Sequence, residues 1–319
     1  MKKTLDAVCL GELLVDFTQA GFSETGMRLF EQNPGGAPAN VAAALARLGA
    51  KAAFAGKVGA DMHGAFLKET LAANNVDTSG LVMDGAVFTT LAFVSLAPNG
   101  ERSFSFARKP GADTCLRPEE VPRALLESAR LFHFGSLSLT CEPARSAALE
   151  ALRIAKSAGA VISYDPNYRA SLWPDEKSAV SMMKSVLPLT DCVKLSEEEA
   201  ALLSGEKDYA KAAEAVLKDG PGCVVVTLGA RGAAAFTRGN DAFAPAPAAP
   251  VVDTTGAGDA FWGAFLWKLL ETGPDPSAFS RDALAACLIF ANAAASCAVQ
   301  KRGGIPSLPT RKEAEEKCV

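Results

Sequence analysis

Short apolar runs alternate with segments of helical periodicity along most of the chain. Runs rich in Val, Ala and Phe predict strands near residues 5–10, 51–57, 130–135, 160–165, 191–195 and 222–228. Apolar residues at helical spacing predict helices near residues 38–48, 62–74, 143–158, 174–187, 208–218, 257–270 and 282–300. This alternation is typical of an α/β protein with a mostly parallel sheet covered by helices on both faces, so we expect a three-layer sandwich.

Two segments do not follow this alternation. Residues 12–33 are strand-like, with turns expected at Gly21 and Gly26. Two further strand-like runs flank Asn99-Gly100, which is a strong signal for a β-hairpin turn. We therefore expect a small β-sheet lid, formed by about residues 12–33 and 87–110, over the larger part of the chain. Because no long linker separates two halves, residues 1–319 are expected to form a single domain.

The composition favours a soluble protein with a small-molecule ligand. Hydrophobic residues make up 49% of the chain and charged residues 21%. The net charge is −4 and no basic stripe is present, so neither nucleic acid nor a membrane surface is an expected partner. The apolar stretch 283–299 is interrupted by Asn292 and Ser296, which favours a buried helix over a membrane span.

Cysteine and histidine chemistry is not expected. The eight cysteines lack metal-ligand spacing and lie mostly in apolar runs, so we interpret them as reduced core residues of a cytoplasmic protein. His63 and His133 have no partner residues at metal or triad spacing, so a carboxylate is the expected acid–base catalyst. Acidic residues Asp6, Glu12 and Asp16 interrupt the N-terminal apolar run, which argues against a signal peptide.

A glycine-rich loop opens the apolar helix that begins near residue 257. The loop reads Asp-Thr-Thr-Gly-Ala-Gly-Asp over residues 253–259. Each glycine in a helix costs about 1 kcal/mol relative to Ala. The presence of Gly256 and Gly258 therefore indicates that the backbone at this point has a role that a side chain would block. Anion binding by bare N–H groups at the helix start is such a role. Asp259 would then stand beside the anion as a general base. The alternative is that Asp253, Thr254 or Asp259 serves as a helix cap, which is the commoner role of an acidic residue at a helix start.

A second glycine-rich loop, Pro-Gly-Gly-Ala-Pro-Ala-Asn over residues 34–40, leads into the helix near 38–48. Gly35 and Gly36 permit close approach of a ligand to the backbone, and Asn40 offers both a donor and an acceptor. The loop could also be an ordinary strand-to-helix turn. Asp16, at the end of the first strand, could bind sugar hydroxyls or be a solvated loop residue.

The common nucleotide-binding motifs are absent from the sequence. The segment Gly49 to Val58 has the wrong spacing for a P-loop, and no Gly-x-Gly-x-x-Gly follows the first strand. Residues 227–232, which read Thr-Leu-Gly-Ala-Arg-Gly, follow an apolar strand at its carboxyl end, where α/β sheets place ligands. Taken alone, this segment could be a turn that leads into a strand at 233–237.

Together these segments resemble the pfkB, or ribokinase-like, carbohydrate kinases over essentially the whole chain. Residues 253–259 resemble the C-terminal signature of that family, and residues 35–40 resemble its N-terminal sugar-binding signature. Within the family the chain is most similar to the fructokinases. Segments 11–17, 35–42, 132–139, 163–174 and 194–199 carry this similarity. The resemblance implies a ribokinase-like fold and transfer of the ATP γ-phosphate to the 6-hydroxyl of fructose.

The resemblance also implies roles for individual residues. Asp259 would be the catalytic base, and the N–H groups of Gly256, Ala257 and Gly258 would form an anion hole. The sugar would be held by Asp16, Gly35, Gly36 and Asn40. Phe104 and Arg108 have the same parity on the second hairpin strand and would face the sugar from the lid. Arg169 is a further sugar-binding candidate, with a surface ion pair as its alternative.

Nucleotide and metal sites follow from the same resemblance. The phosphates and ribose would lie near Lys194, Thr227, Gly229, Gly232 and Gly258, with Asn292 near the adenine. Glu199 would organise Mg²⁺ and its waters, although Ser196 stands where the family usually has Asn. A K⁺ site would be formed by Asp253 and Thr255, the backbone carbonyls of Ala298, Lys301 and Gly303, and the hydroxyl of Ser307.

Other functions remain open at this point. A kinase of the same fold could act on ribose, 2-keto-3-deoxygluconate or a nucleoside, and Arg108 and Arg169 leave an acidic sugar possible. A catalytically silent sugar sensor is a third alternative, but the intact Gly256, Gly258 and Asp259 argue against it. A lid with an exposed sheet face also makes a homodimer through the lid possible.

Overall fold

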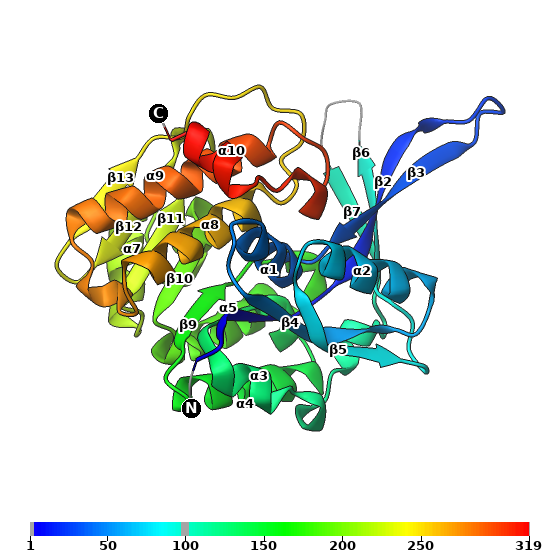
Figure 1. Ribbon diagram of the computed structural model, residues 1–319, viewed down its shortest axis with the longest axis horizontal. Coiled ribbons are helices and arrows are strands. Elements are labelled where there is room, and N and C mark those ends of the chain that lie inside the picture. The colour runs from blue at the N-terminus through cyan, green and yellow to red at the C-terminus, as the bar shows by residue number, and fades with distance from the viewer. Residues whose placement is uncertain (1–2, 97–101, 319) are drawn as a thin grey trace.

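The computed structural model describes residues 3–96 and 102–318, without the side chains of residues 95–96 and 102–104, and contains two sheets (Figure 1). The larger sheet has nine strands in the order β13-β12-β11-β10-β9-β8-β1-β4-β5. Its strands are β1 (Leu5–Leu10), β4 (Ala52–Gly59), β5 (Asp77–Asp84), β8 (Ala129–Gly135), β9 (Val161–Asp165), β10 (Cys192–Ser196), β11 (Cys223–Thr227), β12 (Ala233–Thr237) and β13 (Asp241–Ala244). Only the β11–β12 and β12–β13 pairs are antiparallel within this sheet, so the expected, mostly parallel α/β fold is confirmed.

Helices cover both faces of the large sheet. One face carries α1 (Ala37–Arg47), α2 (Met62–Ala73), α8 (Ala257–Thr272), α9 (Arg281–Ala298) and α10 (Arg311–Glu316). The other carries α3 (Arg123–Ser128), α4 (Ala144–Ser157), α5 (Glu176–Ser185), α6 (Glu197–Ser204) and α7 (Tyr209–Lys218). Strand side chains alternate between the two cores: Ala7 and Cys9 pack on the first side, and Val8 and Leu10 on the second. The expected three layers are therefore present.

Some elements were not anticipated from the sequence. These are strands β5 and β13 and helices α3, α6 and α10. The two strands lie at the edges of the sheet and the three helices are short. None of these elements has a long enough run of regularly spaced apolar residues to be recognised from the sequence.

The smaller sheet has the order β3-β2-β6-β7 and projects from one side of the body (Figure 1). It consists of β2 (Leu14–Phe22), β3 (Arg28–Gly35), β6 (Leu91–Leu96) and β7 (Arg102–Ala107), so the expected second sheet is confirmed. Gly26 lies in the turn before β3, as expected, but Gly21 lies inside β2, where the pairing register shifts after Gln19. The turn expected at Gly21 is thus a β-bulge. Asn99-Gly100 lies outside the described residues.

Helix α9 is the one helix in the described part of the chain that is long and apolar enough to cross a membrane, judged by length and composition alone. In the fold, 56% of this stretch is buried. It packs against α8 and β13 within the first core, as expected for a core helix.

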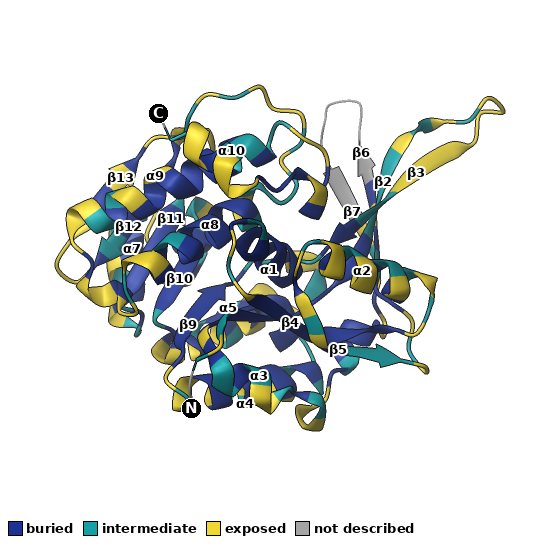
Figure 2. Ribbon diagram, in the orientation of Figure 1, coloured by how far each residue is buried: buried dark blue, intermediate teal, exposed yellow. Residues whose placement is uncertain are grey.

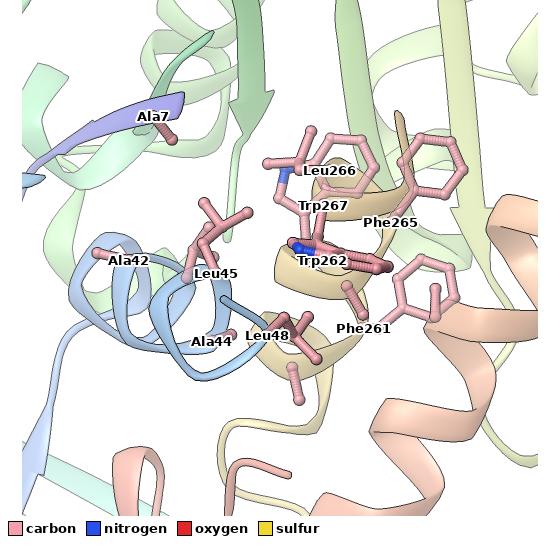
Figure 3. Packing of buried hydrophobic residues seen from close by; sticks show 14 of the residues in the cluster. Ala7, Ala42, Ala44, Leu45, Leu48, Phe261, Trp262, Phe265, Leu266 and Trp267 are labelled. Atoms are coloured by element: carbon pink, nitrogen blue, oxygen red, sulfur yellow. The ribbon is translucent and has the colours of Figure 1, made fainter. Parts of the chain in front are cut away.

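Helices α1 and α8 pack closely side by side (Figure 3). A Cβ atom on Gly263 would lie 2.5 Å from the Cβ of Ala44, so only a glycine permits this approach. Ala44 lies about one turn after Asn40, and Gly263 lies about one turn after Asp259. The close contact therefore brings the first turns of the two helices together, and with them the side chains of Asn40 and Asp259.

Candidate active site

A cavity of about 270 Å³ lies where the first turns of α1 and α8 meet the carboxyl ends of the strands and the small sheet. It brings together many of the residues singled out from the sequence. These are Asp16, Gly36, Asn40, Arg169, Lys194, Asp253, Thr255, Gly256, Gly258, Asp259 and Gly303. The lid contributes Thr18, Asn33, Val94 and Phe106 to the same lining.

A second cavity adjoins the first. Its lining includes Ser196, Glu199 and Thr227, from the ends of β10 and β11 and from α6. Four residues line both cavities, namely Asn167, Arg169, Lys194 and Gly258. The site therefore has two compartments, which meet at the start of α8.

Asp259 lies in the first turn of α8, beside the N-cap residue Gly256, whose φ angle is 74°. Its Oδ2 accepts a 2.7 Å hydrogen bond from Nδ2 of Asn40. Removal from bulk water raises the pKa of Asp259 to about 6, and the Asn40 hydrogen bond acts in the opposite direction. The N-cap residue Gly256 forms no side-chain cap, and Asp259 lies in the first turn of α8, where a carboxylate is also favourable with respect to the helix dipole.

Asp16 lies inside β2, and not at the end of the first strand as expected, and it lines the first cavity together with Asp259. Burial raises its pKa to about 6, Arg169 opposes the shift, and Asp259 adds to it. A Cβ atom on Gly35 would lie 2.2 Å from Oδ2 of Asp16, so this glycine leaves room for the carboxylate. Gly36 has a φ of 109°, and a Cβ there would lie 2.3 Å from the backbone oxygen of Glu12.

Lys194 and Asp165 form a buried ion pair below both cavities. Their Nζ and Oδ2 atoms are 2.6 Å apart, and both side chains are almost fully buried. Burial alone would lower the pKa of Lys194, but the Asp165 and Glu199 carboxylates outweigh it and raise that pKa. Asp165 was not anticipated from the sequence. Its position at the carboxyl end of a buried parallel strand, β9, is the signal that could have found it.

Glu199 is held by backbone donors on both sides. Its Oε2 accepts from the N–H of Ser196 at 2.8 Å, and its Oε1 accepts from the N–H of Tyr168 at 2.6 Å. Ser196 Oγ accepts from the N–H of Glu199 at 3.1 Å, which completes a capping box at the start of α6. Burial raises the pKa of Glu199, with Asp165 adding to the shift. Ser196 thus serves as the N-cap of α6.

The acidic loop before α8 folds back on itself. Oδ1 of Asp253 accepts from the N–H and hydroxyl of Thr255, at 2.9 and 2.8 Å, and Oδ2 accepts from the N–H of Gly303 at 3.0 Å. The N–H of Asp253 itself donates to the carbonyl of Val299, at the end of α9. Three of the expected K⁺ ligands therefore lie together. Of the others, Ser307 Oγ donates to Gly304 O, and Ala298 O accepts from the N–H of Lys301.

Several predicted residues lie away from both cavities. Strand β7 ends at Ala107, so Arg108 lies just after the strand. The alternation of side chains along a strand therefore does not place Arg108 on the same face as Phe104. The Arg108 guanidinium is buried, 2.7 Å from Oδ2 of Asp113, and donates to Leu137 O. The side chain of Phe104 lies outside the described part of the chain. A sugar contact of either residue stays a prediction.

Three residues predicted to contact the nucleotide lie near the β11–β12 connection and the end of β13: Asn292 for the adenine, and Gly229 and Gly232 for the phosphates and ribose. Asn292 is buried and donates from Nδ2 to Ala244 O at 2.9 Å. A Cβ on Gly232 would lie 2.1 Å from the same oxygen, so this glycine closes the β11–β12 connection. Gly229, with a φ of 58°, begins that connection and borders open space. None of the three lines the cavities described above, and their nucleotide contacts stay predictions.

Sequence reasoning missed other cavity residues. From the large part of the chain these are Glu12, Leu137, Asn167 and Thr254, and from the small sheet Leu14 together with the four residues named above. Glu12 and Asn167 carried a usable signal, because each polar side chain follows the carboxyl end of a buried strand of the parallel sheet. The lid residues carried none, since their position depends on how the small sheet sits on the large one.

Comparison with known proteins gives a consistent result. The family model for pfkB family carbohydrate kinases matches residues 4–311. Fructokinase-1 of Oryza sativa subsp. japonica is 44% identical over 314 residues, covering 96% of this chain and 95% of that protein. The crystal structure of a Xylella fastidiosa fructokinase with bound ATP has a TM-score of 0.91 and 35% identity, over 99% of this chain and 98% of that one. A Vibrio cholerae O395 fructokinase with fructose, ADP and calcium bound has a TM-score of 0.88 and 32% identity over both full chains, and its double mutant was solved with potassium.

Proposed function

The chain belongs to the pfkB family of carbohydrate kinases and is an ATP-dependent sugar kinase, and we propose that it phosphorylates D-fructose at the 6-hydroxyl. The observation that carries this proposal is the pair of connected cavities, one lined by sugar-type hydrogen-bonding groups and one by Lys194 and Thr227, which meet at Gly258. An acceptor hydroxyl in the first cavity and a terminal phosphate in the second would meet beside Asp259.

The positions of Asp259, of the N–H groups at the start of α8 and of Arg169 suggest how the phosphoryl group is transferred. Asp259 takes the proton of the acceptor hydroxyl as that oxygen attacks the γ-phosphate. The N–H groups of Gly256, Ala257 and Gly258, at the positive end of α8, receive the negative charge on the phosphoryl oxygens. Arg169 lines both cavities, so its guanidinium is placed to neutralise charge on the group in transit.

Similar solved structures hold ATP in the Xylella fastidiosa fructokinase, ADP with calcium in the Vibrio cholerae O395 fructokinase, and ATP with Mg²⁺ in an E. coli protein. Glu199 already accepts two backbone hydrogen bonds, so we expect it to hold Mg²⁺ through the ion's water molecules. A bound Mg²⁺ would supply positive charge that offsets the negative charge of the ATP phosphates. Nucleotide contacts of Thr227, Gly229, Gly232 and Asn292 belong to the same proposal.

The charge of the first cavity favours a neutral sugar. Glu12, Asp16 and Asp259 all line it. Of the two cations in the described lining, Lys194 is paired with Asp165, whereas the guanidinium of Arg169 donates to the backbone carbonyl of Tyr168. An added carboxylate on the substrate would meet like charges, which argues against 2-keto-3-deoxygluconate. This supports fructose over an acidic sugar.

We expect kcat/KM for D-fructose to exceed that for ribose and for 2-keto-3-deoxygluconate by at least about tenfold, the ratio that corresponds to 1.4 kcal/mol. A coupled assay of ADP release, at identical Mg²⁺ and ATP, measures all three sugars. If either competitor wins, fructose is the wrong acceptor. The family assignment would be unaffected by that outcome.

Potassium is proposed as an activator. Oxygen ligands suit a hard monovalent cation, and Asp253, Thr255 and Gly303 already lie together next to the end of α9. Ala298, Lys301 and Ser307 would complete the shell. A cation there fixes the loop that precedes Gly256, and a 1 Å shift of that loop can cost on the order of 10²-fold in rate.

Initial rates in potassium and in tetramethylammonium, at equal ionic strength, test this. We expect the rate to be higher in potassium, and Asp253→Ala to remove the difference. Lys301→Ala is the control, because Lys301 would bind through its carbonyl and its side chain pairs with Glu313. Equal wild-type rates in the two salts would show that the acidic loop needs no cation.

A homodimer through the lid is also proposed. The small sheet exposes Phe22, Leu29, Phe30 and Phe93, and Figure 2 shows that much of the projecting β2–β3 hairpin is exposed. Contiguous exposed apolar residues of this kind favour association with another protein surface. The absence of nucleic-acid and membrane partners, and a cytoplasmic location, stay predictions.

A further inference from the structure

Glu12 is a buried carboxylate of the first cavity that the proposed chemistry does not use. It follows β1 after one residue, Gly11, and only 3% of its surface is exposed. Its Oε1 accepts a 2.9 Å hydrogen bond from the N–H of Ala37, and its Oε2 has no hydrogen-bond partner among the described residues. Burial of a carboxylate is costly because its charge loses contact with water, so a buried carboxylate usually has a structural or functional role.

The helix that Glu12 touches lacks a cap of its own. The N-cap position of α1 is Gly36, which has no side chain to accept a hydrogen bond, and the first turn of α1 contains no acidic residue. The carboxylate of Glu12, 25 residues earlier in the chain, takes the place of a cap at Ala37. A negative charge at this end of a helix is also favourable with respect to the helix dipole.

Two further contacts hold the same junction. A Cβ on Gly36 would lie 2.3 Å from the backbone oxygen of Glu12, and a Cβ on Gly11 would lie 2.5 Å from Cγ of Pro38. The segment that follows β1 is thus in close contact with the N-cap residue of α1 and with the first two residues of that helix. The first turn that these contacts fix carries Asn40, whose N–H donates to Gly36 O at 2.9 Å.

We propose that Glu12 is a positioning residue, which caps α1 from the end of β1 and thereby sets Asn40 against both the sugar and Asp259. This deepens the proposed sugar-kinase function and rests on it. Two hydrogen bonds and one helical turn form the route: the N–H of Ala37 donates to Glu12, the first turn of α1 leads from Ala37 to Asn40, and Asn40 donates to Oδ2 of Asp259 at 2.7 Å. Burial raises the pKa of Glu12 to about 7, while the Ala37 hydrogen bond favours the ionised, capping form.

Glu12→Ala and Glu12→Gln test the cap, with Asp208→Ala as a matched control that removes the N-cap of the distant helix α7. Loss of a cap corresponds to about a tenfold effect, so we expect Glu12→Ala to raise KM for fructose about tenfold. KM for ATP should change by less than about twofold. Glu12→Gln keeps an acceptor oxygen for Ala37 and should restore most of the sugar affinity, and Asp208→Ala should leave KM for fructose unchanged.

A double-mutant cycle with Asn40→Ala tests the route. If Glu12 acts through Asn40, Glu12→Ala should add little to the loss already caused by Asn40→Ala. If the effects of Glu12→Ala and Asn40→Ala on KM for fructose multiply in the double variant, Glu12 does not act through Asn40. An unchanged KM for fructose in Glu12→Ala would overturn the proposal as a whole, and so would a Glu12→Gln variant as impaired as Glu12→Ala.

Amide hydrogen exchange of the peptide that spans the start of α1 gives a readout without substrate. We expect faster exchange there in Glu12→Ala than in wild type or Glu12→Gln, and no change there in Asp208→Ala. If fructose proved not to be the acceptor, this measurement would still report the cap. If Glu12→Ala phosphorylates fructose but its exchange at the start of α1 is unchanged, Glu12 does not cap α1, and the proposed function still stands.

Discussion

Asp259→Asn is expected to lower kcat by at least about 10²-fold, the loss typical of removing a general base. The substitution keeps the shape of the side chain and an acceptor oxygen for Nδ2 of Asn40, so the sugar site should persist. KM for fructose should therefore change little. The control is Asp282→Asn, which removes an exposed acidic residue from the first turn of α9 and so measures a helix-dipole effect alone. Near-normal turnover in Asp259→Asn would refute the base.

The pH dependence of kcat/KM provides a second signature of the same residue. A base must be ionised to act, and burial raises the pKa of Asp259 to about 6. Activity should therefore be full above this pKa and fall as the pH drops through about 6. Asp16 has a pKa raised to the same range, so part of the acid limb belongs to sugar binding. In Asp259→Asn, the residual kcat should therefore no longer fall as the pH drops through about 6.

Lys194→Met should be the variant with the largest effect on stability. It leaves the Asp165 carboxylate buried without its cation, and breaking a buried ion pair in this way costs about 3–5 kcal/mol. The same change removes a cation that lines both cavities, so KM for ATP should rise by at least about tenfold. Urea unfolding midpoints and steady-state kinetics measure the two effects separately.

The double variant Lys194→Met with Asp165→Asn distinguishes these effects. It removes both charges and retains an acceptor for the N–H of Asn167, which now donates to Oδ1 of Asp165. We expect most of the lost stability to return while ATP use stays impaired. Recovery of ATP use along with stability would mean that Lys194 supports the fold and does not contact phosphate. A Lys194→Met protein as stable as wild type would contradict the buried pair.

Local patterns in the sequence predicted the layers of the fold because each depends on neighbouring residues only. The apolar run of β1 is an example, because Ala7 and Cys9 are buried on one side of the sheet and Val8 and Leu10 on the other. The glycine-rich start of α8 is another, since the bare N–H groups and Asp259 lie within one turn of each other. The edge strands β5 and β13 were missed because they have no full apolar period.

The sequence by itself determined the α/β class, the two glycine-rich helix starts and the residue types of the site, since those follow from short-range periodicity and backbone chemistry. Only the tertiary structure decided which distant residues meet. The approach of Gly263 to Ala44 sets Asn40 against Asp259, the parallel order of β9 and β10 pairs Asp165 with Lys194, and Glu12 reaches a helix that begins 25 residues later. It also turned Arg108 toward Asp113, because a buried guanidinium requires a carboxylate partner and strand parity ends with the strand.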